Sequence, residues 1–569
     1  MTFREIVRMR MGIGALLLCL SLFGGLALAV EGREMVAGLP AAEALRLGEI
    51  MYHKGLLPSG EPMKALVQGG IEMDGTMCSC NNCHMSSGLG SLEGGVFTPP
   101  TNGVKLYAPL RGSKDIPGPT MKRTMFTGSP RPAYTDESLA LSLVSGIDPA
   151  GRTMSEVMPR YELSDRDNEI LVYYLKNLSS EYSPGLTPDT IGLATIITDE
   201  VSPADRDAYL QPLDAYIRDD WNGRVKLVSD QWDALWKRSP ETPKAFRKIE
   251  HSVWTLKGAP DSWGKQLEEY YRQKPVFAIL GGMTTGSWAP MHEFCEKNKI
   301  PAILPTTDLP VISDSDRYTV YFSKGVYQEG EAAAKYLSRV FALPADREIV
   351  QVFRENNDRG RALSRGFAET WEKLGTARLV NRIVQTNEKT AAEFWKTLSS
   401  AHPKAVFLIW LGPDDLAGIG TLADIGNKPL FFSSTLLDGK YPALPDSIRD
   451  ASFITYPTRL PDSEQYSRTL LSNWMKFKKL PMNNLKIASQ VFLLRNVFSE
   501  AMYGTAGEFY REYFLDNVDQ SRDQQQTSIT YPVLSFGPGQ RYASKGCYIV
   551  TLTKGANPKV VRQSDWVIY

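Results

Sequence analysis

The sequence predicts a multidomain protein in which an all-α region is followed by a larger α/β region. Short amphipathic helical patterns and glycine-rich loops run from about residue 30 to about residue 183. From about residue 186 onward, apolar β-rich runs alternate with amphipathic helical runs, a pattern typical of βαβ units around a mainly parallel sheet. The length of 569 residues is sufficient for two or more domains.

Composition excludes several classes of protein. The chain has 64 basic and 64 acidic side chains, and this balance argues against an electrostatic nucleic-acid binder, which needs a basic surplus. Aromatic residues make up 10% of the chain and charged residues 22%, so intrinsic disorder is not expected. Six cysteines are too few for a disulfide scaffold of this length.

The N-terminus has the three parts of a secretory signal. Arg4, Arg8 and Arg10 precede an apolar run over residues 11–28, and small residues end it at Ala29. This order predicts a signal peptide over residues 1–29, cleavage after Ala29, and export to the periplasm. An uncleaved single-span anchor is the alternative, since about twenty residues can cross a bilayer. Membrane contact is expected only through this segment.

Composition also predicts where the domains divide. Residues 30–180 form the first domain and residues 190–569 the second. Between them, residues 181–189 include Ser183-Pro184-Gly185, a polar stretch with a breaker pair that is typical of a linker.

The most specific motif is Cys80-Asn81-Asn82-Cys83-His84. A Cys-x-x-Cys-His run is the attachment pattern of c-type haem: the two thiols form thioethers, and the histidine becomes the proximal ligand. A thioredoxin-like pair is disfavoured because no strand precedes it, and a zinc site because no second Cys/His pair lies nearby. Cys78 and Cys83 would be an alternative attachment pair with a longer spacing, but we expect Cys80 to be the cysteine that binds the haem together with Cys83.

A six-coordinate haem needs a distal ligand, which in electron carriers is usually methionine. The downstream candidates are Met85, Met121, Met125, Met154 and Met158. Met154 and Met158 lie in a loop before a helix that Ser164 and Asp167 cap and that places Ile170, Leu171, Tyr174, Leu175 and Leu178 on one face.

These features together resemble class I cytochrome c. The matching parts are a helix over residues 45–52, the Cys-x-x-Cys-His motif, Met158-Pro159 and the helix end Tyr173-Tyr174-Leu175-Lys176. The resemblance implies one covalent haem c held by Cys80, Cys83 and His84, with Met158 favoured over Met154 as distal ligand. It also implies that Gly48 lies against Tyr173 or Tyr174 where the terminal helices cross, and that redox proteins on the dehydrogenase or oxidase side are partners.

The second region can be traced as alternating elements. Strands are predicted over residues 191–197, 252–256, 276–280 and 300–304, and helices over residues 261–272 and 289–298. Loops rich in Gly, Thr and Ser follow the third and fourth strands. Because ligands gather at the carboxyl ends of strands in open α/β sheets, these loops are the predicted site, and their N–H and hydroxyl groups suit an anion.

This region resembles type I periplasmic substrate-binding proteins of ABC transporters, especially the branched-chain amino acid and amide group. The matching runs are residues 277–282, 299–305, 327–337 and 349–353 with Gly360 and Gly366-Phe367. The resemblance implies two lobes joined by three crossings and closing on a small ligand such as an amino acid, an amide or a small organic acid. It maps ligand contacts onto Thr285, Gly286, Ser287, Thr306, Thr307, Asn357, Trp410 and Ser434. The Thr284-Thr285-Gly286-Ser287 run replaces the family's usual Ser-Ser pair, which leaves the ligand class open.

No hydrolase motif accompanies these features, and five histidines leave few candidate bases, so we expect an electron carrier and binding protein and not an enzyme. We interpret the chain as an exported c-type cytochrome that transfers one electron, with a fused small-molecule-binding domain for sensing or docking. Two alternatives stay open: a solute-binding receptor of an ABC-type uptake system with an accessory haem domain, or the cytochrome subunit of a periplasmic dehydrogenase. Cys295 and Cys547 are either paired or buried thiols.

Overall fold

The computed structural model of the chain describes residues 34–93, 96–110, 129–236, 246–341, 343, 347–375, 377–425, 429–461, 465–520 and 528–568. It divides the chain into two compact units between Glu181 and Tyr182, here unit 1 and unit 2. The predicted signal peptide, Met121 and Met125 lie outside the described residues. No helix in the described ranges is long and apolar enough to span a membrane.

Unit 1 combines short helices with short antiparallel strands, whereas the sequence predicted helices alone. The helices are α2 (Ala41–Lys54), α3 (Cys80–His84), α4 (Gly103–Leu106), α6 (Asp136–Ser145) and α7 (Asp165–Asn177). The strands form three sheets: β1 (Met35–Val36) with β2 (Leu39–Pro40), then β4 (Ile71–Asp74), β3 (Lys64–Val67) and β7 (Arg160–Glu162) in that order, and β5 (Ser91–Glu93) with β6 (Val96–Thr98).

Helices α2 and α7 cross at a glycine. The Ser164 side chain begins α7 by accepting a hydrogen bond from the backbone N–H of Asp167, as the capping pattern predicted. At Gly48 of α2, an added Cβ atom would lie 2.4 Å from Cβ of Tyr174, so only glycine permits this approach. Of the two tyrosines that the sequence offered as the facing residue, the structure therefore selects Tyr174 over Tyr173.

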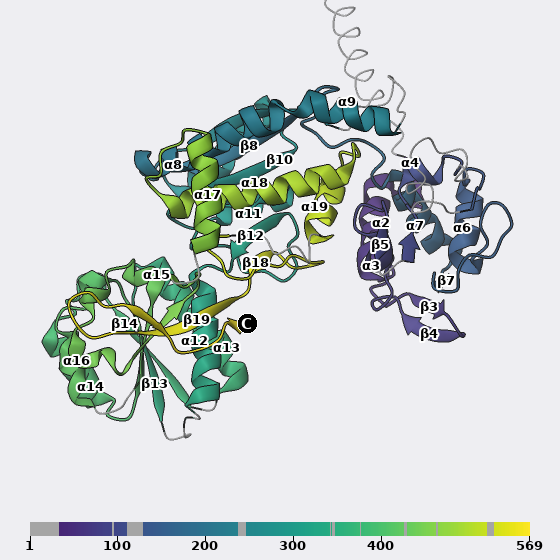
Figure 1. Cartoon of the computed structure of the whole chain (residues 1–569). Coiled ribbons are helices and arrows are strands. Elements are labelled where there is room, and N and C mark those ends of the chain that lie inside the picture. The colour runs from purple at the N-terminus through teal and green to yellow at the C-terminus, as the bar shows by residue number, and fades with distance from the viewer. Residues whose placement is uncertain are drawn as a thin grey trace, which may run out of the picture. The chain divides into compact units, whose positions relative to one another are not determined.

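Unit 2 is built from two α/β lobes (Figure 1). In lobe 1, six parallel strands run in the order β18 (Tyr542–Ser544), β12 (Thr319–Ser323), β11 (Ala302–Ile303), β10 (Ala278–Met283), β8 (Thr190–Thr198) and β9 (Lys248–Leu256). Its helical segments are α8 (Pro203–Ala215), η2 (Tyr216–Asn222), α9 (Val225–Trp236), η3 (Pro260–Ser262), α10 (Trp263–Gln273), α11 (Ala289–Lys297), α17 (Gln465–Phe477), α18 (Leu485–Thr505) and α19 (Arg511–Gln520). The uninterrupted apolar character of β8 follows from its burial on both faces of a parallel sheet.

Lobe 2 has an eight-stranded sheet. Its strand order is β14 (Arg378–Val384), β13 (Glu348–Arg354), β15 (Val406–Trp410), β16 (Leu430–Ser433), β17 (Ser452–Tyr456), β19 (Gly546–Leu552) and β20 (Val560–Arg562), with β21 (Val567–Ile568) also paired to β19. Its helical segments are α12 (Val326–Val340), α13 (Asp358–Leu374), α14 (Ala392–Ala401), η4 (Pro413–Asp415), η5 (Ile419–Ile425), α15 (Ser434–Leu437), η6 (Tyr441–Ala443) and α16 (Asp446–Arg449). Helices α12 and α13 pack on one face of the sheet, and α14 and α16 on the other (Figure 1).

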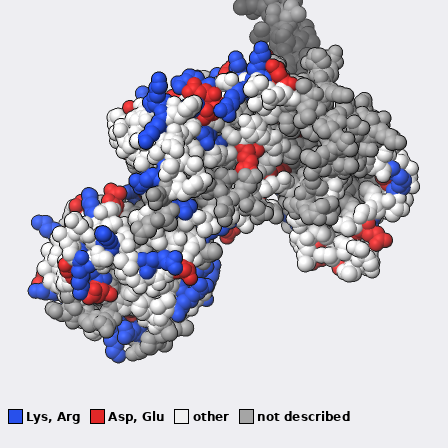
Figure 2. Space-filling view, in the orientation of Figure 1, with Lys and Arg blue, Asp and Glu red and all other residues white. Residues whose placement is uncertain are grey.

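The chain passes between the lobes three times, after β12, after β17 and after β18. This confirms the predicted two-lobed α/β architecture with a mainly parallel sheet in each lobe. Basic and acidic side chains are interspersed over the visible face of unit 2 (Figure 2), in keeping with the equal numbers of the two charges in the sequence.

Candidate functional site

The Cys-x-x-Cys-His motif forms the short helix α3 in unit 1. Cys80 is buried, and its Sγ lies 4.0 Å from the hydroxyl of Tyr161, which donates a hydrogen bond to the Cys78 carbonyl at 2.6 Å. Burial raises the pKa of the Cys80 thiol to about 12. Cys83 is exposed, and the described cysteines form no disulfide. The motif therefore presents one inward and one outward thiol on a single turn.

His84 ends this turn and is buried. Its Nδ1 lies 2.8 Å from the carbonyl oxygen of Pro99, which can only accept, so Nδ1 carries the proton. Among the described residues nothing hydrogen-bonds Nε2. Metal-bound histidines commonly donate the other N–H to a carbonyl in this way, which fixes the tautomer and the ring orientation. Burial also lowers the pKa of His84, which favours the neutral ring.

Met158 and Met154 are both half-buried but differ in packing. Met158 packs against the hydrophobic cluster that contains Cys80, whereas Met154 is not part of that cluster. The Arg160 guanidinium donates hydrogen bonds to the carbonyls of both methionines and so holds their loop in place. This packing favours Met158 as the methionine nearer to the motif.

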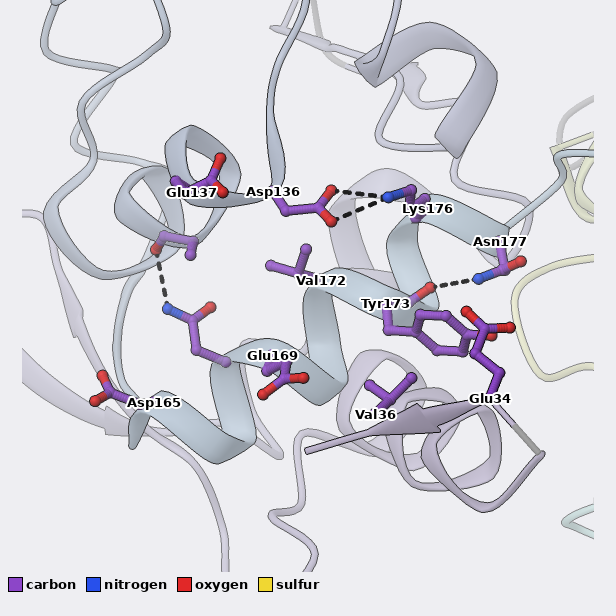
Figure 3. Close-up of a pocket in the computed structure, with 12 residues that line it drawn as sticks. Glu34, Val36, Asp136, Glu137, Asp165, Glu169, Val172, Tyr173, Lys176 and Asn177 are labelled. Atoms are coloured by element: carbon purple, nitrogen blue, oxygen red, sulfur yellow. Dashed lines mark hydrogen bonds and ion pairs between the residues drawn. The ribbon is translucent and has the colours of Figure 1, made fainter. Parts of the chain in front are cut away.

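An acidic pocket of about 620 Å³ lies elsewhere on unit 1, between α6, α7 and the N-terminal strand (Figure 3). Its charged lining consists of Glu34, Asp136, Glu137, Asp165, Glu169 and Lys176. Lys176 pairs with Asp136 at 3.0 Å and the Asn177 side chain donates to the carbonyl of Tyr173 at 2.8 Å. The ion pair links α7 to α6, and the Asn177 hydrogen bond caps the C-terminal end of α7. Both contacts have a structural role.

In lobe 1 the structure brings together the two loops that the sequence predicted as a site. Near the end of β10, Gly281 and Gly282 both have positive φ, a conformation that favours glycine, and the register with β8 shifts there. The Thr284 hydroxyl then accepts from the Gly286 N–H at 3.2 Å, and the Thr307 hydroxyl donates to the Gly286 carbonyl at 3.0 Å. Because β10 and β11 are neighbouring parallel strands, residues 284–287 and 306–308 meet at one edge.

The predicted ligand residues of lobe 1 differ in whether their hydroxyl groups are accessible to a ligand. Thr285 and Ser287 are exposed, and Gly286 and Thr307 are half-buried. The hydroxyl of Thr306 already donates to Gln490 of α18 at 3.1 Å. The Thr285 hydroxyl donates to Glu200 at a long 3.5 Å, and the Ser287 hydroxyl accepts from the Ala289 N–H at 3.2 Å, so it keeps its own proton to donate. Thr285 and Ser287 are therefore the two predicted residues whose hydroxyls a ligand can reach from solvent.

Lobe 2 contributes Arg359, which the sequence analysis did not identify. Its guanidinium forms an ion pair with Asp308 at 3.1 Å and donates to the carbonyl of Thr285 at 3.4 Å. Its buried Nε has no hydrogen-bond partner among the described residues. Asn357, a predicted ligand residue, instead caps α13 by accepting from the Gly360 N–H at 3.0 Å, and so begins the helix that positions Arg359. Residues 284–287, 306–308 and Arg359 are called the interlobe site below.

Trp410 is a correction to the predicted ligand set. It is fully buried, and its Nε1 donates to the side chain of Gln351 at 2.8 Å. Alternate residues of β15 face opposite sides of the sheet, and Trp410 lies with Val406 and Leu408 on the side that α12 and α13 cover. The indole is part of the core of lobe 2 and is not available to a ligand.

Ser434 begins α15 directly after β16 and is half-buried. Beside it, the Ser433 hydroxyl donates at 2.8 Å to Oε2 of Glu329, a fully buried carboxyl of α12 that also accepts from Thr455 at 2.6 Å. Burial raises the pKa of Glu329 to about 7, and the nearby charge of Asp308 acts in the same direction. Glu329 is not among the predicted site residues, although a carboxyl in an alanine-rich buried helix is a usable signal.

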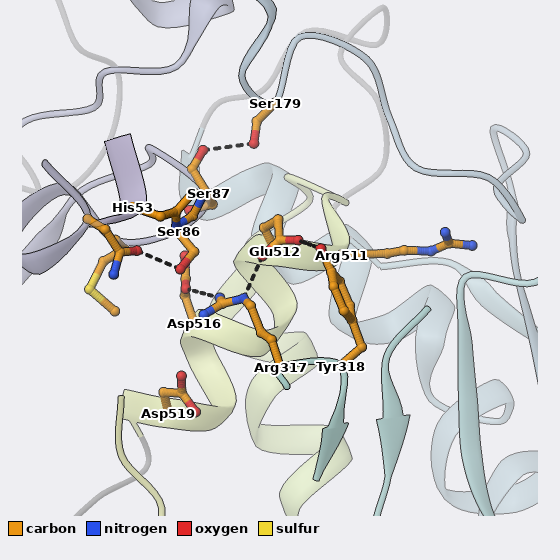
Figure 4. A network of polar contacts seen from close by, with 12 residues as sticks. His53, Ser86, Ser87, Ser179, Arg317, Tyr318, Arg511, Glu512, Asp516 and Asp519 are labelled. Atoms are coloured by element: carbon orange, nitrogen blue, oxygen red, sulfur yellow. Dashed lines mark hydrogen bonds and ion pairs between the residues drawn. The ribbon is translucent and has the colours of Figure 1, made fainter. Parts of the chain in front are cut away.

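A second, partly buried polar network holds the edge of the lobe 1 sheet (Figure 4). Arg317 donates to Glu512 at 2.7 Å and to Asp516 at 2.9 Å, which ties the approach to β12 to α19. Next to it, Arg541 pairs with Asp519 at 2.5 Å, and burial raises the pKa of Asp519 to about 6. This network connects three segments distant in sequence and has a stabilising role.

Comparison with solved structures finds similar proteins of low sequence identity. A fatty acid ABC transporter substrate-binding protein from Thermomonospora curvata is 15% identical with a TM-score of 0.46, over 68% of this chain and 95% of that chain. An ABC transporter substrate-binding protein from Sphaerobacter thermophilus is 13% identical with a TM-score of 0.47, over 67% and 98%. A branched chain amino acid ABC transporter from Thermus thermophilus with bound valine is 12% identical with a TM-score of 0.45, over 68% and 98%. Comparison with curated proteins finds no match.

A protein-family comparison is decisive for the second unit, because residues 247–522 match the family described as periplasmic binding protein. Unit 2 has a periplasmic-binding-protein-like fold. The match spans segments of both lobes of this periplasmic-binding-protein-like unit, from β9 to the end of α19. It lies wholly within unit 2, so the resemblance of unit 1 to cytochrome c and the haem remain predictions.

Proposed function

We propose that unit 2 is the solute-binding unit of an exported receptor that serves ABC-type uptake. The observation that carries this proposal is the interlobe site, where Arg359 of lobe 2 meets Thr285 and Asp308 of lobe 1. The match to periplasmic binding protein and the three crossings between the lobes support it. Two lobes joined in this way can close on a small molecule held between their facing loops.

The chemistry of the interlobe site favours a solute with a carboxylate, such as an amino acid, an amide bearing a carboxylate or a small organic acid. The exposed hydroxyls of Thr285 and Ser287 and the N–H groups of their loop can donate to an anion. Arg359 supplies the positive charge, and its Nε offers a further donor. Within this proposal, Gly286, Thr306, Thr307 and Ser434 shape the site, and Asn357 acts through its cap on α13.

A thermal-shift screen of amino acids, amides and organic acids tests this function on the full chain. A solute at about 100 times its Kd stabilises the folded protein by about 2.7 kcal/mol, which raises Tm measurably. We expect Arg359→Met to weaken the binding of the solute so found by about tenfold or more, since a charge-assisted hydrogen bond is lost.

Arg378→Met is the matched control, because Arg378 is an exposed arginine of lobe 2 on β14, remote in the sheet from the interlobe loops. It should leave the affinity unchanged. Equal losses in the two variants, or the absence of any stabilising solute, would contradict the proposed site.

We propose as a second function that unit 1 carries one covalent haem c and exchanges electrons with redox partner proteins. The residues of the motif suit haem c. Cys80 and Cys83 place two thiols on one turn, and the buried His84 donates its Nδ1–H to the Pro99 carbonyl. Met158 packs against the same cluster as Cys80, so its thioether is the one that would help to hold the haem iron. When bound, the haem supplies one-electron redox chemistry.

Cysteine variants test the haem proposal with an internal control. We expect covalent haem, seen by peroxidase staining of a denaturing gel, in the wild type and in Cys78→Ala. It should be absent from the double variant Cys80→Ala/Cys83→Ala. Loss of the stain on replacing Cys78, or its absence from the wild type after expression with a c-type maturation system, would overturn the assignment.

A further inference from the structure

Lobe 1 has a pocket of about 420 Å³ that shares no residue with the interlobe site. It lies between η2, α17 and α18, and its volume falls in the range of small-molecule sites. Aromatic and cationic side chains make up most of its lining, among them Trp221, Arg224, Phe477, Lys478, Arg495 and Tyr503.

The pocket lining has more positive than negative charge. The Asp220 carboxylate accepts from Trp474 Nε1 at 3.0 Å and forms ion pairs with Lys478 Nζ at 2.5 Å and with Arg495 at 3.5 Å. One lining carboxylate thus serves two cations. Arg224, a third lining cation, is exposed and forms no ion pair within the described part of the chain. An additional anion would therefore find cationic partners already in place.

Aromatic rings hold Arg495 in position. Its guanidinium carbon lies 4.1 Å from the ring centroid of Phe492 and 5.0 Å from that of Trp474, and its side chain is 19% exposed. A guanidinium fixed between rings loses little rotamer freedom when it binds a carboxylate. Its Nε and Nη2 donate to Oδ1 of Asn496, another lining residue, at 3.2 and 3.0 Å. This side chain is therefore preorganised, and a planar anion would take the place of the Asn496 amide oxygen at that edge of the guanidinium.

Apolar rings form the other part of the lining. Phe477 is 79% exposed at the end of α17, although an aromatic side chain is usually buried. Tyr503 is partly exposed and stacks on Trp221, with ring centroids 5.6 Å apart. These surfaces can cover the body of an aromatic ligand whose charged end reaches the cations.

The backbone under the pocket is unusual as well. Segment η2 is a π-helix that follows Pro212 of α8, and it supplies Tyr216, Asp220 and Trp221 to the lining. The Tyr216 hydroxyl lies 2.7 Å from that of Ser499 on α18, which fixes the two segments together. π-Helical turns occur frequently at functional sites.

We propose that this pocket is a second ligand site, specific for small aromatic carboxylates and separate from the interlobe site. The carboxylate is held by Arg495 and Arg224, and the ring lies against Phe477 and Tyr503. This inference does not depend on which solute the interlobe site takes.

Titration of the full chain with benzoate, followed by ligand-observed NMR and calorimetry, tests the proposal. We expect saturable binding, at least tenfold weaker in Arg495→Met and at least threefold weaker in Arg224→Met. Benzyl alcohol, which has the ring without the charge, should bind at least tenfold more weakly than benzoate. Arg218→Met is the matched control, since Arg218 belongs to η2 but does not line the pocket, and it should leave binding unchanged.

A variant of the interlobe site distinguishes the two sites. Thr285→Val should leave benzoate binding unchanged, because Thr285 lies outside the pocket. The proposal is overturned if benzoate does not saturate, if neither Arg495→Met nor Arg224→Met weakens it, or if Thr285→Val abolishes it. The last result would place benzoate in the interlobe site instead.

Discussion

Replacing Glu329 by glutamine is expected to remove a pH-dependent destabilisation of lobe 2. The carboxyl is fully buried on α12, where Ser433 and Thr455 donate hydroxyl hydrogen bonds to Oε2. Its other oxygen, Oε1, has no hydrogen bond within the described residues. Desolvation by burial raises the pKa of Glu329, whereas the hydroxyl hydrogen bonds lower it. Desolvation is the larger effect, and the pKa rises from 4.5 to about 7.

The size and sign of the effect follow from linkage. Below about pH 4.5, Glu329 is protonated in both the folded and the unfolded chain, and it makes no pH-dependent difference to stability. Between about pH 4.5 and 7 only the unfolded chain ionises, so the free energy of unfolding falls as pH rises. Above about pH 7.5 the cost is complete and amounts to about 3 kcal/mol.

Urea unfolding of the full chain, followed by circular dichroism from pH 4.5 to 8, measures this effect. Glu329→Gln should match the wild type near pH 4.5 and exceed its stability at pH 8 by about 3 kcal/mol. Glu372→Gln, on an exposed part of α13, is the control and should keep the wild-type pH profile. If Glu329→Gln showed the wild-type dependence on pH, or lost stability at pH 8, the reasoning about this carboxyl would be wrong.

Two further predictions concern packing. Gly48→Ala should lower the stability of unit 1 by about 1–3 kcal/mol in thermal unfolding, because the new methyl group meets Tyr174. Gly264→Ala, where a Cβ meets nothing within 4 Å in the first turn of α10, should instead raise stability by about 0.5–1 kcal/mol. Trp410→Phe should cost lobe 2 about 1–3 kcal/mol because Oε1 of the buried Gln351 loses its hydrogen bond, while solute affinity measured by calorimetry stays unchanged. A loss of affinity without a loss of stability would reinstate Trp410 as a ligand residue.

Hydrophobic periodicity and capping residues predicted most local elements correctly. The apolar run over residues 191–197 is strand β8, and Ser164 begins α7 as its capping pattern indicated. Strand-end loops were also predictable, because adjacent parallel strands must end at the same edge of a sheet. The residues around Thr285 and Thr307 meet for that reason.

Sequence patterns could not assign contacts that depend on which face or which distant segment a side chain meets. Trp410 ends a continuous apolar strand, and such a run does not show which of its alternating side chains face a covering helix. Arg359 meets Asp308 across 51 positions of sequence, and nothing local distinguishes it from other helix arginines. Among the short strands of unit 1, β7 escaped prediction because its partner β3 lies nearly a hundred residues earlier. The locally paired strands are only two to four residues long, too short for an alternating pattern.

Hydrogen–deuterium exchange of the full chain, with and without the solute found by thermal shift, shows whether one solute is held by both lobes. Backbone amides in residues 284–287 and 306–308 of lobe 1 and in the first turn of α13 in lobe 2 should become protected together, because one ligand contacts both lobes. Protection confined to a single lobe, or located away from these three segments, would contradict a solute-binding site between the lobes.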